Sequence, residues 1–105
     1  MDMDSINDIL QWNIEVGFIC GLRYRQYNYG QGRALLNALK EVPAVQGDLL
    51  DVAFFRKVWD IGMFLEVRQA DFRSEELLGE AELLRLRELC DNILVEIDRI
   101  INAGA

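Results

Sequence analysis

Apolar side chains recur at helical spacing along the last quarter of the chain. The stripe consists of Leu86, Cys90, Ile93, Ile97 and Ile100, which follow one another at intervals of four or three residues. Residues at these intervals lie on one side of an α-helix, so the pattern predicts a long helix with one face buried in a core. Oppositely charged residues at helical spacing occupy the other positions, as on a solvated helix face.

Three more segments have helical periodicity, and none shows the strict alternation that indicates a half-buried strand. We predict helices from Asp4 or Ser5 to Leu22, from Arg33 to Glu41, from Leu49 to Ala70 with Asp48 as N-cap, and onward from Ser74 as N-cap. A turn is predicted at residues 28–32 and a loop at residues 44–47, because Pro43 ends the second helix. At 105 residues the chain is long enough for one domain. The sequence therefore predicts a single all-α domain over residues 1–105, a small antiparallel bundle of four helices, three long and one short.

The first predicted helix is apolar around most of its circumference from Ile14 onward. We expect it to be a central helix, covered by its neighbours on more than one side. Gly17 and Gly21 lie one turn apart within it. Because a glycine costs about 1 kcal/mol in a helix interior, we expect this pair to allow another backbone to approach closely.

The side-chain inventory excludes several kinds of active site. The chain contains no histidine, so it can form neither a Ser–His nor a Cys–His dyad and offers no imidazole to a metal. Cys20 and Cys90 lie far apart in apolar surroundings, which indicates buried thiols in a reducing compartment rather than zinc ligands. A disulfide between them stays open at this stage. No glycine-rich phosphate-binding motif occurs.

Carboxylates offer the one enzyme hypothesis, a magnesium-dependent hydrolase of nucleotides. Glu88 and Asp91 share a face of the last predicted helix. Magnesium needs convergent oxygen ligands, but Asp60 and Glu66 on the third predicted helix point in different directions. We therefore expect a protein that is not an enzyme and has neither a metal nor a cofactor.

The third predicted helix carries more large apolar side chains than one core face can hold. Its core face consists of Leu50, Phe54, Val58, Ile61 and Leu65. A second group, which we call the aromatic arc, consists of Val52, Phe55, Trp59 and Met63. Exposed apolar patches larger than a few hundred Å² are uncommon on monomers. The aromatic arc therefore predicts a protein interface, and we expect a homodimer.

A basic segment interrupts an otherwise acidic chain. What we call the Arg/Tyr island consists of Arg23, Tyr24, Arg25, Tyr27, Tyr29 and Arg33. Arginine and tyrosine are enriched in binding hot spots, which favours a partner-binding patch. Arginines near a helix end and half-buried tyrosines also have purely structural uses, and this alternative stays open. Nucleic acid is an unlikely partner, because the net charge of the chain is −7.

The leading hypothesis is a non-enzymatic protein–protein interaction module, a small adaptor, chaperone or regulator that binds another protein and itself. The alternative is an acidic mimic of nucleic acid that inhibits a basic nucleic-acid-binding protein, with weak nucleic-acid binding as a third and lesser option. The acidic N-terminus lacks the basic region of a signal peptide, and no apolar stretch is long enough to span a membrane. We therefore expect a cytoplasmic protein.

Overall fold

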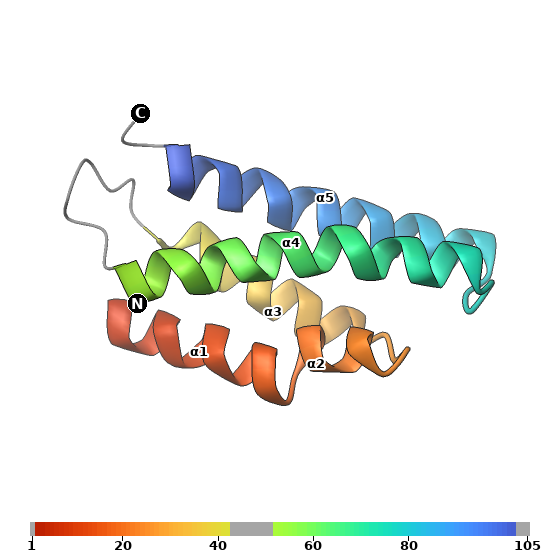
Figure 1. The fold of residues 1–105 in the computed structure, drawn as a ribbon, viewed down its shortest axis with the longest axis horizontal. Coiled ribbons are helices and arrows are strands. Elements are labelled where there is room, and N and C mark those ends of the chain that lie inside the picture. Colours follow the sequence, from red (N-terminus) through yellow and green to blue (C-terminus); the bar gives the residue numbers. More distant parts are fainter. Residues whose placement is uncertain (1, 43–51, 103–105) are drawn as a thin grey trace.

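The computed structural model describes residues 2–42 and 52–102. Its helices are α1 (Met3–Glu15), α2 (Phe18–Arg23), α3 (Tyr29–Lys40), α4 (Val52–Ser74) and α5 (Glu80–Asn102). Within the described ranges there is no strand. Because α2 continues α1 after a short break, the helices form four arms (Figure 1). The prediction of a small all-α bundle is confirmed.

The predicted core faces are buried where the structure describes them. In α4 the buried side chains include Phe54, Val58, Ile61 and Leu65. The stripe from Leu86 to Ile100 is buried along α5, and Leu35, Leu36 and Leu39 are buried in α3. Leu50, the N-cap at Asp48, Pro43 and the loop at residues 44–47 lie outside the described residues.

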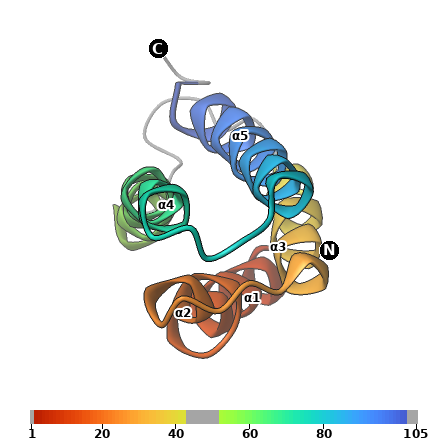
Figure 2. The same cartoon turned by 90° about the vertical axis from the view of Figure 1, so that its right-hand side faces the viewer.

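The four arms form a ring in the order α1–α2, α3, α5, α4 (Figure 2). Consecutive arms in the sequence run in opposite directions, as predicted (Figure 1). The ring nevertheless has two parallel edges, α1 beside α4 and α3 beside α5. Side chains link these edges. Lys57 Nζ donates to Asn7 Oδ1 at 2.7 Å, and Arg99 Nη2 donates to the Leu39 carbonyl at 3.0 Å. The two antiparallel edges, α1–α3 and α4–α5, therefore lie on opposite sides of the ring.

The first arm is broken at Gly17, which corrects the prediction of one continuous helix. Asn13 is buried at the break. Its Nδ2 donates to the Ile9 carbonyl at 2.9 Å, and its Oδ1 accepts from the Phe18 amide at 3.1 Å. One side chain thus satisfies a free amide at the start of α2. A Cβ at Gly17 would collide with the Trp12 ring and lie 2.9 Å from Asn13 Oδ1.

The break also explains why the first arm reads as apolar on all sides. Ile6 and Leu10 are buried in α1, and Phe18 and Leu22 are buried in α2, whereas Val16 at the break is 62% exposed. Each helix therefore buries one side only, and the break shifts the phase between the two. The prediction of a central helix covered on several sides was wrong, because a single helical wheel superimposes two registers.

Close packing of other helices around a glycine occurs at Gly32, whereas the close neighbours of Gly17 and Gly21 belong to the first arm and the turn that follows it. Gly32 is buried in α3, where a Cβ would lie 2.8 Å from Phe18 Cε1 and closer still to Leu89 Cδ2. It is the point where α2, α3 and α5 meet. The sequence predicted a turn at residues 28–32, but Asn28 is instead the N-cap of α3, and its Oδ1 accepts from the Gln31 amide at 3.0 Å.

Two helices end in the same capping motif without a glycine. At the end of α2, the Gln26 amide donates to the Gly21 carbonyl and the Arg25 amide donates to the Leu22 carbonyl, with Arg25 at φ 59°. Glu76, at φ 52°, has the equivalent place after α4. These are Schellman motifs, in which glycine usually takes the left-handed position. Their sequences therefore lack the usual stop signal.

The end of α4 corrects the predicted start of the last helix. Ser74 is the last residue of α4, and its Oγ donates to the Asp71 carbonyl at 3.4 Å. Ser74 is therefore not an N-cap, and α5 begins only at Glu80. Helix α4 extends four residues beyond the predicted end at Ala70, because its capping motif forms around Glu76.

We expect Gly32→Ala to destabilise the fold by about 1–3 kcal/mol, because the added methyl group overpacks the contact with Leu89 and Phe18. The matched control is Gly30→Ala, on the exposed side of the same helix, where a Cβ would lie 3.4 Å from Asn28 Oδ1. This control should be neutral or stabilising, since alanine favours helix by about 1 kcal/mol. Urea unfolding of both variants gives the two free energies. Equal effects would contradict the close contact at Gly32.

Asn13→Ala is expected to cost about 1–3 kcal/mol, because it leaves the Phe18 amide without its acceptor at a buried site. Asn92→Ala, on the exposed side of α5, is the control and should change stability by less than about 0.5 kcal/mol. Thermal unfolding followed by circular dichroism measures both variants. A large loss in the control, or none at Asn13, would refute the role of this side chain at the break.

Candidate functional site

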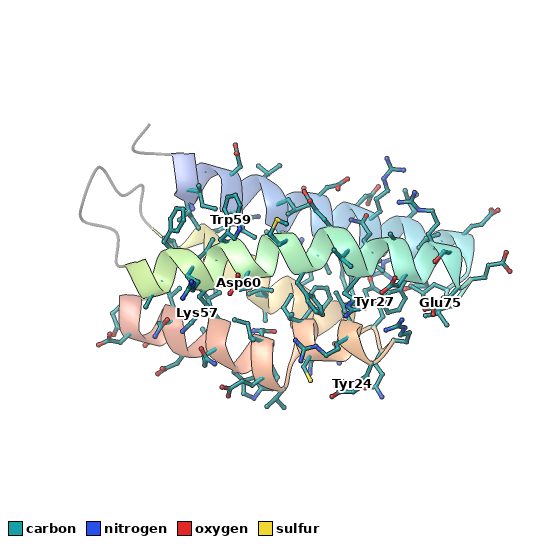
Figure 3. The ribbon with its side chains drawn as sticks, viewed as in Figure 1. Tyr24, Tyr27, Lys57, Trp59, Asp60 and Glu75 are labelled. Carbon is teal, nitrogen blue, oxygen red and sulfur yellow. The ribbon has the colours of Figure 1, made fainter. Side chains whose placement is uncertain are left out.

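Two members of the aromatic arc remain exposed in the folded chain. Trp59 and Met63 are each 50% exposed, although they lie in the middle of a long, well-packed helix. Trp59 lies on the side of α4 toward α5, whereas Lys57 lies on the side toward α1 (Figure 3). The Phe55 ring stacks on Trp59, with 6.4 Å between the ring centroids and 16° between the planes. The fourth member, Val52, opens α4, but its side chain lies outside the described residues.

A groove of about 270 Å³ lies between α4 and α5 beside these two side chains. Its lining residues are Trp59, Gly62, Met63, Glu66, Leu94, Ile97, Asp98 and Ile101. Gly62 is buried, and a Cβ there would lie 3.6 Å from Ile97. The absence of that side chain leaves room at the floor. The sequence did not single out Leu94 and Ile101, although their spacing of seven residues places them on one side of α5.

A second hollow of about 300 Å³ continues the α4–α5 edge toward the α4–α5 loop. It is lined by Gln69, Arg73, Glu80, Leu83, Leu84 and Arg87. Leu84 is 55% exposed, and Val95 on the same helix is 65% exposed. We call the surface formed by the two hollows and these exposed side chains the α4–α5 face. It combines apolar side chains with Glu66 and Asp98 at one end and with Arg73, Arg87 and Glu80 at the other.

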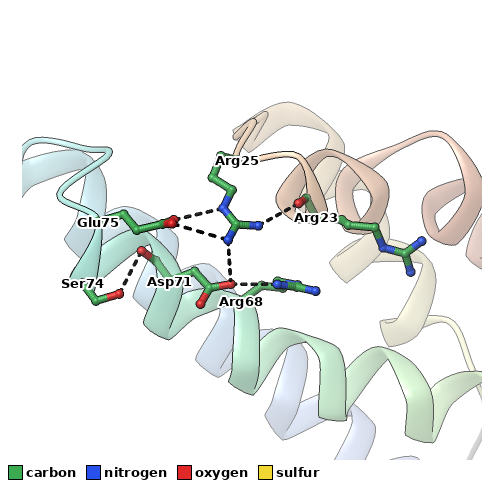
Figure 4. Close-up of polar contacts among 6 residues, drawn as sticks. All are labelled: Arg23, Arg25, Arg68, Asp71, Ser74 and Glu75. Atoms are coloured by element: carbon green, nitrogen blue, oxygen red, sulfur yellow. Dashed lines mark hydrogen bonds and ion pairs between the residues drawn. The ribbon is translucent and has the colours of Figure 1, made fainter.

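Arg25 of the Arg/Tyr island is held by internal contacts. Its Nε donates to Glu75 Oε2 at 2.9 Å, Nη2 lies 3.7 Å from Asp71 Oδ2, and Nη1 donates to the Arg23 carbonyl at 3.0 Å (Figure 4). Arg68 shares the Asp71 carboxylate at 2.9 Å. The hydrogen bond and the charge of Glu75 raise the pKa of Arg25. This cluster ties the end of α2 to the last turn of α4.

The two half-buried tyrosines of the island also face inward. Tyr29 packs on the core beneath Arg85, whose Cζ lies 4.3 Å from the ring centroid. The hydroxyl of Tyr27 is buried without a hydrogen-bond partner among the described residues, and burial raises its pKa to about 12. The sequence left open whether the residues of the island bind a partner or stabilise the fold. Contacts within the chain give Tyr27, Tyr29 and Arg25 a structural role.

The island is not brought together with the aromatic arc. Arg25 contacts Asp71 in the last turn of α4, whereas Trp59 lies about three turns earlier in the same helix. Arg23 lies over the Phe64 ring at 5.3 Å. Tyr24, which is 67% exposed, and Arg33, which is exposed on α3, are the members that face solvent without such a contact. The island therefore does not form one continuous exposed patch with the arc.

A groove of about 680 Å³ on the opposite edge, between α1 and α3, was not predicted from the sequence. Its lining residues are Asp8, Ile9, Trp12, Asn13, Ala34, Asn37, Ala38 and Glu41. Trp12 is 46% exposed and closes one side, and the small alanines of α3 leave the groove open. In the sequence, the features that form this groove are Trp12 and the two alanines Ala34 and Ala38, which lie one turn apart. They predict a groove only once it is known that α1 packs beside α3.

The acidic residues of α5 are interrupted by ion pairs. Arg85 Nη1 lies 3.4 Å from Glu82 Oε1, and Arg99 Nε lies 2.8 Å from Glu96 Oε2. Within residues 2–42 and 52–102, no three His, Cys, Asp or Glu side chains are grouped so that they could hold a metal ion. In the same ranges, no helix combines the length and apolar character needed to cross a bilayer.

Comparison of the chain with protein-family models, with curated proteins and with solved structures yields no match. Functional inference therefore depends on the geometry of the chain itself.

Both cysteines are free thiols with different surroundings. Cys20 is half-buried, whereas Cys90 is fully buried, and burial raises its pKa from an ordinary 9.0 to about 12. We expect Cys20 to react with a thiol reagent in the native chain and Cys90 to react only after unfolding. A Cys20→Ala variant should show no reactive native thiol. Fast reaction in that variant would contradict the buried position of Cys90.

The same burial predicts a pH dependence of stability. Between pH 9 and pH 12 the folded chain keeps the Cys90 proton that the unfolded chain releases, so the free energy of unfolding falls as the pH rises through this window. Replacement of Cys90 by alanine should flatten the curve measured by urea unfolding. The residual slope reports the Tyr27 hydroxyl, whose raised pKa acts in the same direction.

Proposed function

We propose that this protein is a non-enzymatic protein–protein interaction module, a small adaptor, chaperone or regulator, and that the α4–α5 face is its contact surface. The observation that carries the proposal is the half-exposure of Trp59 and Met63 beside an apolar groove. Tryptophan is among the residues most enriched in binding hot spots. A large exposed apolar patch with a polar rim commonly marks a site of interaction with another molecule.

The stability of the fold does not require this exposure. Helix α4 already buries Phe54, Val58, Ile61 and Leu65, and the outer positions of a surface helix are ordinarily polar. The apolar side chains on the outer side of α4 and α5 therefore add surface that only a partner would cover. Among the candidate surfaces, the α4–α5 face combines a stacked aromatic pair with a hollow floor at Gly62.

The acidic-mimic alternative predicts a different behaviour. An inhibitor of this kind would bind a basic partner through the carboxylates of α5, with strong sensitivity to salt. Binding through the α4–α5 face depends on apolar contact and should persist at moderate salt. The ion pairs that Arg85 and Arg99 make with neighbouring glutamates favour the apolar contact over the mimic.

Capture experiments with matched variants test the proposal. The immobilised chain, a Trp59→Ala/Met63→Ala variant and a Trp12→Ala control are incubated with nuclease-treated extract of the source cells at two salt concentrations. We expect a retained protein that the control also binds and that the double variant loses by tenfold or more. Retention that is equal for all three chains, or that disappears at moderate salt with every chain, would overturn the assignment of the α4–α5 face.

A further inference from the structure

We propose that the groove between α1 and α3 binds a basic amphipathic helix of a partner protein. This groove lies on the edge of the ring opposite the α4–α5 face (Figure 2), so it adds a second contact surface to the proposed function and does not depend on the first. Three features of the groove support an occupant of this kind: its apolar lining, the internally bonded backbones of its walls, and the unpaired carboxylates at one end.

The lining of the groove is mostly apolar, and its α3 wall is low. Ile9 and Trp12 line it from α1, and Ala34 and Ala38 line it from α3, where they lie one turn apart. Because these alanines project only a methyl group, a third helix can approach α3 toward the short end of the usual 8–10 Å range of distances between helix axes. The half-exposed indole of Trp12 is then available to cover the side of that helix.

The walls of the groove are helices, which restricts the conformation of an occupant. The backbone groups of α1 and α3 are bonded within their own helices, so an extended peptide finds no strand edge to pair with. Asn13 lines the groove, but its side-chain oxygen and nitrogen are both engaged within the first arm. A helix satisfies its own backbone amides and carbonyls and needs few partners in the groove. A helix is therefore the occupant that this lining favours.

Unpaired acids stand at one end of the groove. Asp8 and Glu41 both line it and are exposed, and neither forms an ion pair within the described ranges. Since α1 and α3 run antiparallel, Asp8 in the first half of α1 and Glu41 directly after α3 lie at the same end (Figure 1). Residues 1–22 and 41–55 contain no Lys or Arg. A basic side chain of a partner would therefore meet two carboxylates without a competing base beside them in these segments.

The bases of α3 lie on another side of that helix. Arg33 and Lys40 follow Tyr29 by four and eleven residues, a spacing that places all three on one side of α3. Tyr29 packs beneath Arg85 of α5. The side of α3 that carries its bases is thus turned toward α5 and away from α1, and the groove keeps its acidic character.

Charge also argues against a second copy of this chain as the occupant. The net charge of the chain is −7, and exposed positions of its longest amphipathic stripe, on α5, include Glu82, Glu88 and Asp91. Such a helix would bring further acids to Asp8 and Glu41, and like charges weaken association. The partner is instead a protein that presents Lys or Arg beside an apolar helix side, the helix-in-groove mode of recognition.

Selection from a random peptide library identifies the class of occupant. Phage that display random peptides of about 16 residues, long enough as a helix to span α1 or α3, are selected at moderate salt on the immobilised chain. We expect the enriched peptides to combine apolar residues at helical spacing with Lys or Arg, and to lack proline in their centre. Isothermal titration calorimetry with a synthetic copy of an enriched peptide then gives its dissociation constant.

Ala34→Phe fills the groove from an exposed position and should weaken the enriched peptide by about tenfold or more. The matched control is Ala70→Phe, the same replacement at an exposed alanine of α4 outside this groove, which should leave the dissociation constant unchanged. Agreement of the two variants would place the peptide elsewhere on the chain and overturn the inference.

Reversal of the charges tests the acidic end. The Asp8→Lys/Glu41→Lys variant should lose the basic peptide and, in a repeated selection, enrich acidic amphipathic peptides instead. A gain of this kind requires a folded groove, so it separates loss of charge from loss of structure. Glu88→Lys/Asp91→Lys, the same change of net charge at exposed positions of α5, is the control and should still enrich basic peptides.

The inference is overturned if the library yields no shared pattern, if the enriched peptides are acidic or rich in proline, or if basic peptides bind without apolar residues at helical spacing. Peptides that Trp59→Ala/Met63→Ala weakens and Ala34→Phe does not would overturn the α1–α3 groove and leave the proposed function intact. Binding that Ala34→Phe removes and Trp59→Ala/Met63→Ala does not would support the groove, whatever the capture experiment shows for the α4–α5 face.

Discussion

The contact at Gly32 determines how the arms of this bundle meet. Because α3 has no side chain at this position, Phe18 of α2 and Leu89 of α5 can both lie against its backbone. A methyl group there would force these helices apart. The first arm must also bend before it reaches this point, and the buried Asn13 side chain stabilises the bend by accepting from the first amide of α2. In the resulting ring, α4 and α5 are adjacent, and the edge between them lies opposite the edge between the first arm and α3 (Figure 2).

This arrangement explains why the candidate site lies at an antiparallel edge. A ring of four arms has no fifth helix to cover an outer side, so each helix can bury only about half of its circumference. Helix α4 carries large apolar residues beyond that half, and they emerge beside α5 as Trp59 and Met63. Gly62 keeps the groove between the two helices open. Two members of the Arg/Tyr island have a different role, since Arg25 connects the turn before α3 to Asp71 of α4, and Tyr29 of α3 packs beneath Arg85 of α5.

Much of the fold was predictable because long amphipathic helices have a strong periodic signal. The buried stripes of α4 and α5 are the clearest example, where they are described. The boundaries failed for local reasons. At the end of α4, Glu76 takes the left-handed position where glycine is usual, so no stop signal marked this end. The break at Gly17 depends on a hydrogen bond between Asn13 and Phe18, which periodicity does not show. At the candidate site, the sequence predicted that α4 has more large apolar side chains than the core can bury, and Trp59 and Met63 are indeed half-exposed. The groove residues of α5 and the entire α1–α3 groove required knowledge of which helices are neighbours, and so did the internal role of Arg25.

The two tryptophans occupy different edges of the ring. Trp12 covers Gly17 and lines the groove between α1 and α3, whereas Trp59 borders the groove between α4 and α5. Each indole is about half exposed, so its fluorescence responds to whatever covers it. A chain that keeps one tryptophan, with the other replaced by phenylalanine, therefore reports optically on a single edge. Opposite sides of this small molecule can be observed separately with no attached dye.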